Sequence, residues 1–305
     1  MPILIVGSVA LDTVETPFDK AERLVGGSAS FISLAASYFT KDTRLVGVVG
    51  GDFPQSAIEM FREHSIDAEG LQIVPEGKTF HWHGKYHFDM NNRDTIATEL
   101  NVFADFDPRI PDSYKSCEFV CLGNIDPVLQ RRVLDQISKP RLIVCDTMNF
   151  WIESKYDELM KTLKVVDVVI INDGEARELT KEYSLIKAGN KILSYGPKLA
   201  IVKKGEHGAL LFTGKSLFSA PAFPLEEVFD PTGAGDTFAG GFIGWLAKTG
   251  DLSEENLRRA VIYGSVMASF SVERFGIERL RNLSWEEIQG RFMEFKRLSY
   301  FEEKN

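Results

Sequence analysis

Short apolar runs alternate with segments of helical periodicity through the second part of the chain, and this alternation limits the fold more than any other feature. The runs are Phe119–Leu122, Leu142–Cys145, Val168–Ile171 and Leu199–Val202. Strands separated by helical segments of this length predict a doubly wound, mostly parallel sheet flanked by helices. Earlier apolar runs at Ile3–Val6 and Leu45–Val49 add strands to it. We therefore predict a single α/β domain over residues 1–305.

Composition excludes several classes of partner. The chain has 305 residues, is 44% hydrophobic and carries a formal net charge of −9. A nucleic acid or an anionic membrane would require a basic face, so neither is expected as a partner. No apolar run approaches the length that spans a membrane, and the cysteines, Cys117, Cys121 and Cys145, lack metal-like spacing. We expect buried thiols and a cytoplasmic location.

One glycine-rich turn carries the strongest chemical signal. The stretch from Asp230 to Asp236 reads DPTGAGD and is followed directly by an apolar run from Thr237 to Ala247. A turn of this kind at the start of a helix leaves several backbone N–H groups free to bind an anion. Asp236 then lies in the first helical turn, where a carboxylate could accept a proton from an attacking hydroxyl. The alternative is an ordinary capped helix start.

Polar residues follow four of the expected strands. They are Asn124, Asp146, Asn172 and Lys203. In open α/β sheets ligands bind outside the carboxyl ends of the strands. The four residues therefore predict a polar cleft at that edge of the sheet, and Asp12, expected in the loop after the first strand, falls there too.

Several motifs occur in the order typical of one family. DPTGAGDTFAGGF resembles the C-terminal signature of the ribokinase-like, or PfkB, family of carbohydrate kinases. Gly26-Gly27, Asn172 to Glu175 and Gly205 to Gly208 match its other landmarks, so the resemblance spans nearly the whole chain. It implies a ribokinase-like fold with a small β-sheet lid.

The resemblance also implies a site for ATP and magnesium. Asn172 and Glu175 match the N-x-x-E motif, in which Glu175 would hold Mg²⁺ through water, although a capping box explains the same pair. Residues expected near the nucleotide are Lys203, where threonine is commoner, Gly205, Gly208, Gly233, Gly235 and Ser265. Asp230 and Thr232 match part of a monovalent-cation site, which would take K⁺.

The residues that match the family's substrate site include one departure. By resemblance Asp12 would accept hydrogen bonds from substrate hydroxyls, and Gly26 and Gly27 would touch the substrate with their backbone. Phe31 stands where the family usually has an asparagine that binds the substrate. The substrate of ribokinase therefore cannot be transferred directly to this chain.

A small sheet outside the main fold is predicted from a period-two pattern. Thr79 to Met90 alternates an aromatic face (Phe80, Trp82, Tyr86, Phe88) with a polar face that includes His81, His83 and His87. We expect a lid from about residues 13–25 and 71–105. A zinc site on the histidines is less favoured than a polar outer or partner-facing surface. The aromatic face could cover the substrate, or pack against a second lid in a homodimer, as in some family members.

Together these motifs predict a phosphoryl transfer. Asp236 would deprotonate the acceptor, while N–H groups of Gly233, Ala234, Gly235 and Asp236 stabilise the moving phosphoryl group of ATP. The preferred acceptor is the primary hydroxyl of a small sugar. The alternatives are a nucleoside kinase, favoured by Phe31 and the aromatic strand, and a nucleotide-binding protein without catalysis.

Overall fold

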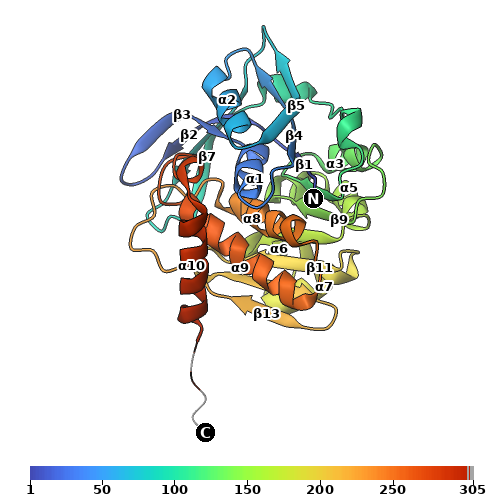
Figure 1. Ribbon diagram of the computed structural model, residues 1–305, viewed down its shortest axis with the longest axis vertical. Helices are drawn as coiled ribbons and strands as arrows, with labels where there is room; N and C mark the ends of the chain where they lie inside the picture. The colour runs from blue at the N-terminus through green and yellow to red at the C-terminus, as the bar shows by residue number, and fades with distance from the viewer. Residues whose placement is uncertain (301, 303–305) are drawn as a thin grey trace.

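A nine-stranded sheet forms the centre of the molecule in the computed structural model, which describes residues 1–300 and 302 (Figure 1). Its order is β13-β12-β11-β10-β9-β8-β1-β4-β5, and all neighbours are parallel except β11-β12 and β12-β13. The strands are β1 (Ile3–Val6), β4 (Thr43–Gly50), β5 (Ile66–Val74), β8 (Phe119–Leu122), β9 (Leu142–Asp146), β10 (Val168–Asn172), β11 (Leu199–Lys203), β12 (Ala209–Thr213) and β13 (Leu217–Ala220). The predicted doubly wound, mostly parallel sheet is confirmed.

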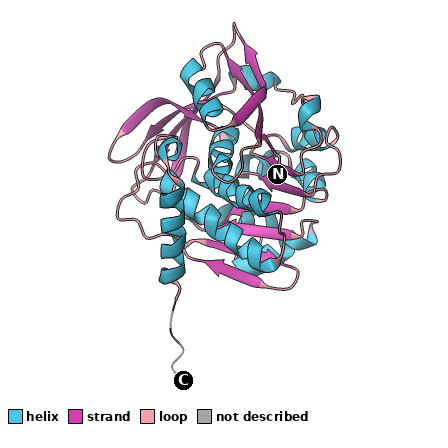
Figure 2. Ribbon diagram, viewed as in Figure 1, coloured by secondary structure: helices cyan, strands magenta, loops and turns pink. Residues whose placement is uncertain are grey.

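Helices cover both faces of this sheet (Figure 2). Alternate side chains of β1 enter different cores: Ile3 and Ile5 pack in one, Leu4 and Val6 in the other. The first core lies under α1 (Ser28–Ser37), α2 (Gln55–Glu63), α8 (Ala234–Thr249), α9 (Glu254–Ser271) and α10 (Trp285–Leu298). The second lies under α3 (Pro127–Leu134), α4 (Asn149–Ser154), α5 (Tyr156–Leu163), α6 (Asp173–Thr180) and α7 (Leu185–Ser194). Central strands such as β1 and β8 are buried on both sides, so their sequences are continuously apolar.

A second, four-stranded sheet lies beside the first, at the left of Figure 1, in the order β3-β2-β6-β7. Its strands are β2 (Ala10–Glu15), β3 (Lys20–Gly26), β6 (Phe80–Tyr86) and β7 (Arg93–Glu99). Residues 71–74, which we expected in the lid, instead end β5 of the large sheet. Asp12 is also corrected, because it lies on β2 rather than in a loop. Phe88 follows β6 and is 81% exposed, so it does not extend the aromatic face.

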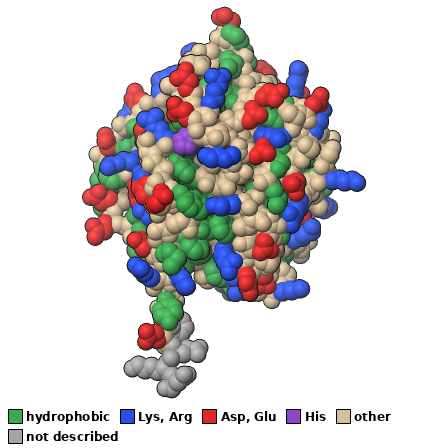
Figure 3. All heavy atoms as spheres, viewed as in Figure 1, with side chains coloured by type: hydrophobic (Ala, Val, Ile, Leu, Met, Phe, Trp, Pro, Cys, Tyr) green, Lys and Arg blue, Asp and Glu red, His purple; other side chains and the backbone are tan. Residues whose placement is uncertain are grey.

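Charged side chains of both signs are interspersed over the visible surface (Figure 3). Within residues 1–300, no helix combines the length and apolar character needed to cross a membrane. Cys117, Cys121 and Cys145 are all buried free thiols, as the sequence predicted.

Candidate active site

The turn before α8 has the geometry expected of an anion site. Gly233 is the N-cap of α8 and adopts a left-handed conformation with φ 75°. A Cβ atom there would also lie 2.3 Å from the Phe31 ring, so both backbone and packing require glycine. The Ala234 N–H donates to the Pro231 carbonyl at 3.2 Å. Of the four predicted amide donors, those of Gly233, Gly235 and Asp236 remain without an acceptor in the described part of the chain.

Phe31 has a packing role that its position in the motif did not suggest. Its side chain is 1% exposed and lies against the turn at Gly233. The sequence predicted Phe31 among the substrate contacts, and the structure shows that its ring also packs against the anion turn. The sequence could not distinguish the two, because a phenylalanine on a helix beside a ligand site fits either environment.

Lys203 extends from the end of β11 to the same helix start. A Cβ atom at Gly235 would lie 2.5 Å from the Lys203 Nζ, so the glycine leaves room for the ammonium group. The Nζ is 3.9 Å from Oδ2 of Asp146, which ends β9. Although burial alone would lower the Lys203 pKa, the neighbouring carboxylates of Asp146, Glu175 and Asp236 raise it above its ordinary value. The ammonium group is therefore charged when an anion arrives.

Three carboxylates share this single lysine. Burial, with the charge of Asp146, raises the pKa of Asp236 to about 7 and that of Glu175 to about 7. The pKa of Asp146 is raised by its own burial, against the lowering effect of Lys203. Such a cluster has an excess of negative charge that a divalent cation would relieve. The donor set therefore fits Mg²⁺, as the sequence suggested.

Asn172 and Glu175 form the capping box that the sequence allowed. Oδ1 of Asn172 accepts from the Glu175 N–H at 2.8 Å, and Oε2 of Glu175 accepts from the Asn172 N–H at 2.7 Å. The remaining Glu175 oxygen, Oε1, is free for a water of a hydrated ion. Residues 1–300 contain no group of three or more His, Cys, Asp or Glu side chains placed to bind a metal directly.

The turn after β11 carries the two glycines expected near the nucleotide. Gly205, with φ 55°, begins the 3-10 turn Gly205–His207, and Gly208, with φ 81°, follows it. A Cβ atom at Gly205 would lie 2.6 Å from Oδ1 of Asn91, at the tip of the β6–β7 hairpin. Ser265 is 9% exposed in α9, which packs against α8. Its predicted place beside the adenine stays a prediction.

Asp12, on β2, lies beside Gly26 and Gly27 at the end of β3. A Cβ atom at Gly26 would lie 2.0 Å from Oδ2 of Asp12, and Gly27 has φ 87° with Ser8 O 2.5 Å from its Cβ position. Burial and the charges of Asp230 and Asp236 raise the Asp12 pKa to about 8, while the Gly27 N–H lowers it. Asp12 and Asp236 therefore lie in one electrostatic environment.

Asp230 clamps two loops rather than lying open to solvent. Its Oδ1 accepts from the Thr232 N–H at 2.8 Å and its Oδ2 from the Gly276 N–H at 2.9 Å. The Thr232 hydroxyl is 3.2 Å from the Tyr86 hydroxyl of β6. The cation positions predicted from the sequence thus join the anion turn to the second sheet.

The lid histidines lie beside separate partners. Nε2 of His81 is 3.0 Å from the Thr13 hydroxyl, and Nε2 of His83 is 3.1 Å from Oε1 of Glu15. His87 follows β6 and lies beside Asp94. This arrangement agrees with the polar surface that was preferred over a zinc site.

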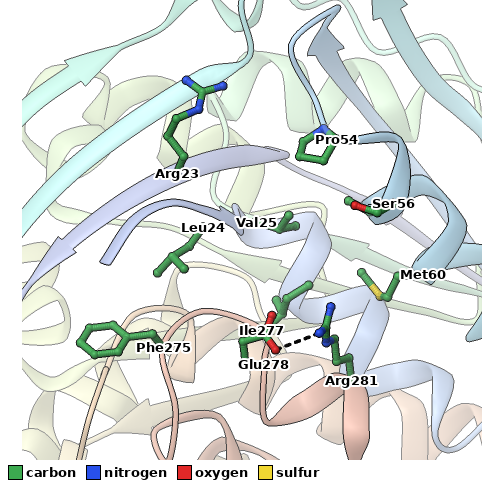
Figure 4. Close-up of a pocket in the computed structure, with 11 residues that line it drawn as sticks. Arg23, Leu24, Val25, Pro54, Ser56, Met60, Phe275, Ile277, Glu278 and Arg281 are labelled. Atoms are coloured by element: carbon green, nitrogen blue, oxygen red, sulfur yellow. Dashed lines mark ion pairs between the residues drawn. The ribbon is translucent and has the colours of Figure 1, made fainter. Parts of the chain in front are cut away.

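A cavity of ≈ 210 Å³ lies behind β3, against α2 and the segment from Phe275 to Arg281 (Figure 4). Both arginines that line it are ion-paired, Arg23 with Asp52 and Arg281 with Glu278, each at 3.0 Å. None of the predicted site residues lines this cavity. Its position is therefore separate from the cleft at the strand ends.

Comparison with known proteins agrees with this geometry. Residues 9–281 match the family described as pfkB family carbohydrate kinase. The chain belongs to this family. It is therefore a phosphotransferase that acts on a hydroxyl group, and the resemblance inferred from the motifs is confirmed.

The names of relatives of this pfkB family member indicate more than one class of phosphate acceptor. A cytidine kinase of Thermococcus kodakarensis is 29% identical over 259 residues, covering 83% of this chain and 91% of the relative. A Burkholderia thailandensis nucleoside kinase with inosine has a TM-score of 0.75 at 21% identity, covering 96% and 98% of the two chains. A putative ribokinase II of E. coli with ATP and Mg²⁺ has a TM-score of 0.78 at 19% identity, covering 96% and 99%. The structural matches confirm the ribokinase-like fold.

Sequence reasoning missed how the second sheet completes the cleft. It placed Tyr86 on an aromatic face but could not pair it with Thr232, and it did not single out Asn91, Arg93 or Thr95. These contacts depend on the β6–β7 register, which shifts between His83 and Gly84. A period-two pattern does not reveal such a shift.

Proposed function

We propose that this kinase transfers the γ-phosphoryl group of ATP to the 5′-hydroxyl of a nucleoside. The observation that carries the proposal is the pairing of Asp12 with Trp82 in the register of β2 and β6. Directly paired residues project from the same face of a sheet. A carboxylate that binds ribose hydroxyls and an indole that stacks on a base therefore lie side by side.

The Trp82 ring is held in place by its neighbours. A Cβ atom at Gly84 would lie 1.9 Å from the indole, so the ring lies across this glycine. Nε1 donates to the Thr95 hydroxyl at 3.3 Å. A flat apolar surface next to hydrogen-bonding groups suits a nucleobase better than a free sugar. The names of the cytidine kinase and nucleoside kinase relatives support the same class.

The chemistry follows from the groups around the α8 turn. Asp236 accepts the proton of the 5′-hydroxyl as its oxygen bonds to the γ-phosphorus. The bond from that phosphorus to the β,γ-bridging oxygen breaks, and ADP leaves with the electron pair. The amides of Gly233 and Gly235 and the Lys203 ammonium stabilise charge on the phosphoryl group. Glu175 would hold Mg²⁺ through water, and the ion would supply positive charge that neutralises the phosphates.

A sugar kinase is the second candidate. Asp12 with the exposed backbone at Gly26-Gly27 could bind the hydroxyls of a free sugar without any role for Trp82. The likeness to a putative ribokinase II supports this candidate. The nucleoside and sugar candidates differ in whether the Trp82 indole contributes to binding of the acceptor.

Acceptor profiling separates the candidates. We would measure ADP release with Mg-ATP for cytidine, inosine, adenosine, ribose and fructose, with K⁺ or with tetramethylammonium as the monovalent cation.

Trp82→Ala should raise the nucleoside KM by about 10- to 100-fold, since base–aromatic stacking is worth about 1–3 kcal/mol, and Trp82→Phe should recover part of it. Turnover on sugars alone, insensitive to Trp82, would replace the nucleoside assignment. ATP binding without turnover of any acceptor would favour a non-catalytic protein. A loss of activity without K⁺ would support the cation site at Asp230 and Thr232.

A further inference from the structure

One buried glutamine bridges the ends of two central strands. Gln130 lies on α3, and its side chain is 1% exposed. Its Nε2 donates to the Gly123 carbonyl at 3.0 Å and to the Asp146 carbonyl at 2.9 Å. Its Oε1 accepts from the Cys145 thiol at 3.5 Å. The amide thus uses both of its donors and its oxygen, as a buried amide must to leave no polar group unpaired.

The two carbonyls that Gln130 joins lie where β8 and β9 separate. The last residues that pair between these strands are Leu122 and Cys145. Gly123 and Asp146 are therefore the first positions without a ladder contact between β8 and β9. The Gln130 amide takes the place of that contact, because it binds one carbonyl from each strand. It fixes how far apart these two strand ends lie, at the edge of the sheet where ligands bind.

Gly123 borders the part of the site expected to bind the acceptor. Its N–H donates to the Val6 carbonyl at 2.8 Å. A Cβ atom at Gly123 would lie 2.6 Å from Oγ of Ser28, the first residue of α1. Ser28 directly follows Gly26 and Gly27. The end of β8 therefore packs against the helix start that carries the glycine pair.

Asp146 borders the part of the site expected to bind the phosphates. Its Oδ2 lies 3.9 Å from the Lys203 Nζ, and that ammonium group lies against Gly235 at the start of α8. The charge of Asp146 also raises the pKa of Asp236, the expected base. A shift of the Asp146 backbone would move its carboxylate relative to both groups. One amide, that of Gln130, therefore connects the acceptor side of the site with the phosphate side.

We propose that Gln130 is a positioning residue for the phosphoryl transfer, which sets the distance between the bound acceptor and the phosphate end of the nucleotide site. The inference rests on the proposed function but not on the choice between a nucleoside and a sugar, because Gly26 and Gly27 are expected to contact either. Gln130 touches neither reactant and takes no part in the bonds that form and break. It acts through alignment, since a misplacement of about 1 Å can lower a rate by about 100-fold.

Gln130→Met removes the bridge while it keeps the length of the side chain. It should lower kcat by about 10- to 100-fold and leave the KM values for Mg-ATP and for the acceptor within about 3-fold, because each side of the site keeps its own contacts. The kcat would be expressed per ATP-binding site, counted by calorimetry on the full chain, so that a smaller folded fraction does not imitate the result. Gln130→Asn keeps an amide that is one methylene shorter and cannot span both carbonyls. Its kcat should lie between, and it tests the role if Gln130→Met does not fold.

Gln136→Met is the matched control, because it makes the same substitution just beyond the other end of α3. The Gln136 amide also donates to two backbone carbonyls, that of Pro108 at 2.9 Å and that of Arg132 at 3.0 Å. Gln136→Met should have the kcat and KM values of the wild type.

A wild-type kcat per site in the Gln130 variants would overturn the role of Gln130. A rise in one KM as large as the fall in kcat would also overturn it, because it indicates damage to one side of the site. A wild type that phosphorylates sugars alone would overturn the nucleoside assignment, and the same comparison on the sugar would then decide the role of Gln130. A wild type that phosphorylates no acceptor would overturn the proposed function and this role with it.

Discussion

The two halves of the cleft differ in how the fold holds them. The large-sheet half consists of residues at strand ends and a helix start, such as Asp146, which is 6% exposed between the two cores. In the second-sheet half, β7 is exposed at every position but one. That sheet meets the anion turn and the nucleotide turn through single side-chain contacts, such as Tyr86 with Thr232.

This difference indicates a division of tasks. Groups that handle charge need fixed positions, because electrostatic stabilisation of a transition state depends on preorganised groups. Burial in the second-sheet half is uneven: Asp12 on β2 is 6% exposed, whereas the edge strand β7 is exposed and can open at lower cost. We therefore expect changes in the large-sheet half to affect the chemical step, and changes in the second sheet to affect acceptor binding.

The largest effect is expected at Asp236. Asp236→Asn should lower kcat by roughly two to four orders of magnitude, because general base catalysis is lost, while ATP still binds. In the wild type, kcat/KM should fall as the pH drops below about 7, since the carboxyl group with a raised pKa must be ionised to accept a proton. Steady-state assays over a pH series measure both.

Asp157→Asn is the control for that change, because it alters an acid in the first turn of α5, away from the cleft. It should have normal kcat. Near-normal turnover in Asp236→Asn would exclude this residue as the base and would remove the main functional distinction between the two halves.

A smaller effect is expected at Lys203. Lys203→Met should weaken ATP binding and lower kcat by about 10- to 100-fold, since it removes a charge that faces the α8 start. It should also raise the pKa of Asp236 further, which shifts the acid limb of the pH profile of kcat/KM to higher pH. Lys198→Met removes a paired but exposed lysine just before β11 and should change neither. An unaltered pH profile would contradict the electrostatic coupling described here.

The smallest effect on the chemical step is expected at Asp12, in the second-sheet half. Asp12→Asn should raise the acceptor KM more than it lowers kcat. At pH 8 the free energy of unfolding of Asp12→Asn should exceed that of the wild type by on the order of 1 kcal/mol. The buried Asp12 carboxyl group has a raised pKa in the folded state, so its contribution to stability is present at low pH and is lost as the pH rises towards about 8. At pH 4 the two proteins should unfold alike. Denaturant unfolding at both values, beside acceptor kinetics, measures this, and equal stability at pH 8 would contradict the buried charge.

The sequence predicted most of the large-sheet half because its signals are local. Strands such as Phe119–Leu122 agree with the structure, and the remaining bounds differ by a few residues, as with the strand expected at Leu45–Val49, which is Thr43–Gly50. The capping box at Asn172 and Glu175 and the glycine turn at Gly233 were also readable, because each depends on neighbours within a few positions. The position of Asp12 on a strand and the contact of Phe31 with Gly233 were not readable, since both depend on distant parts of the chain.

By itself the sequence determined the family, the sheet and the anion turn, because periodicity, glycine placement and motif order are written along the chain. Only the tertiary structure placed Lys203 against Gly235, Phe31 against Gly233, and Trp82 beside Asp12. Each of these depends on the register or packing of segments far apart in sequence. Register is set by long-range burial and pairing, which no local pattern encodes.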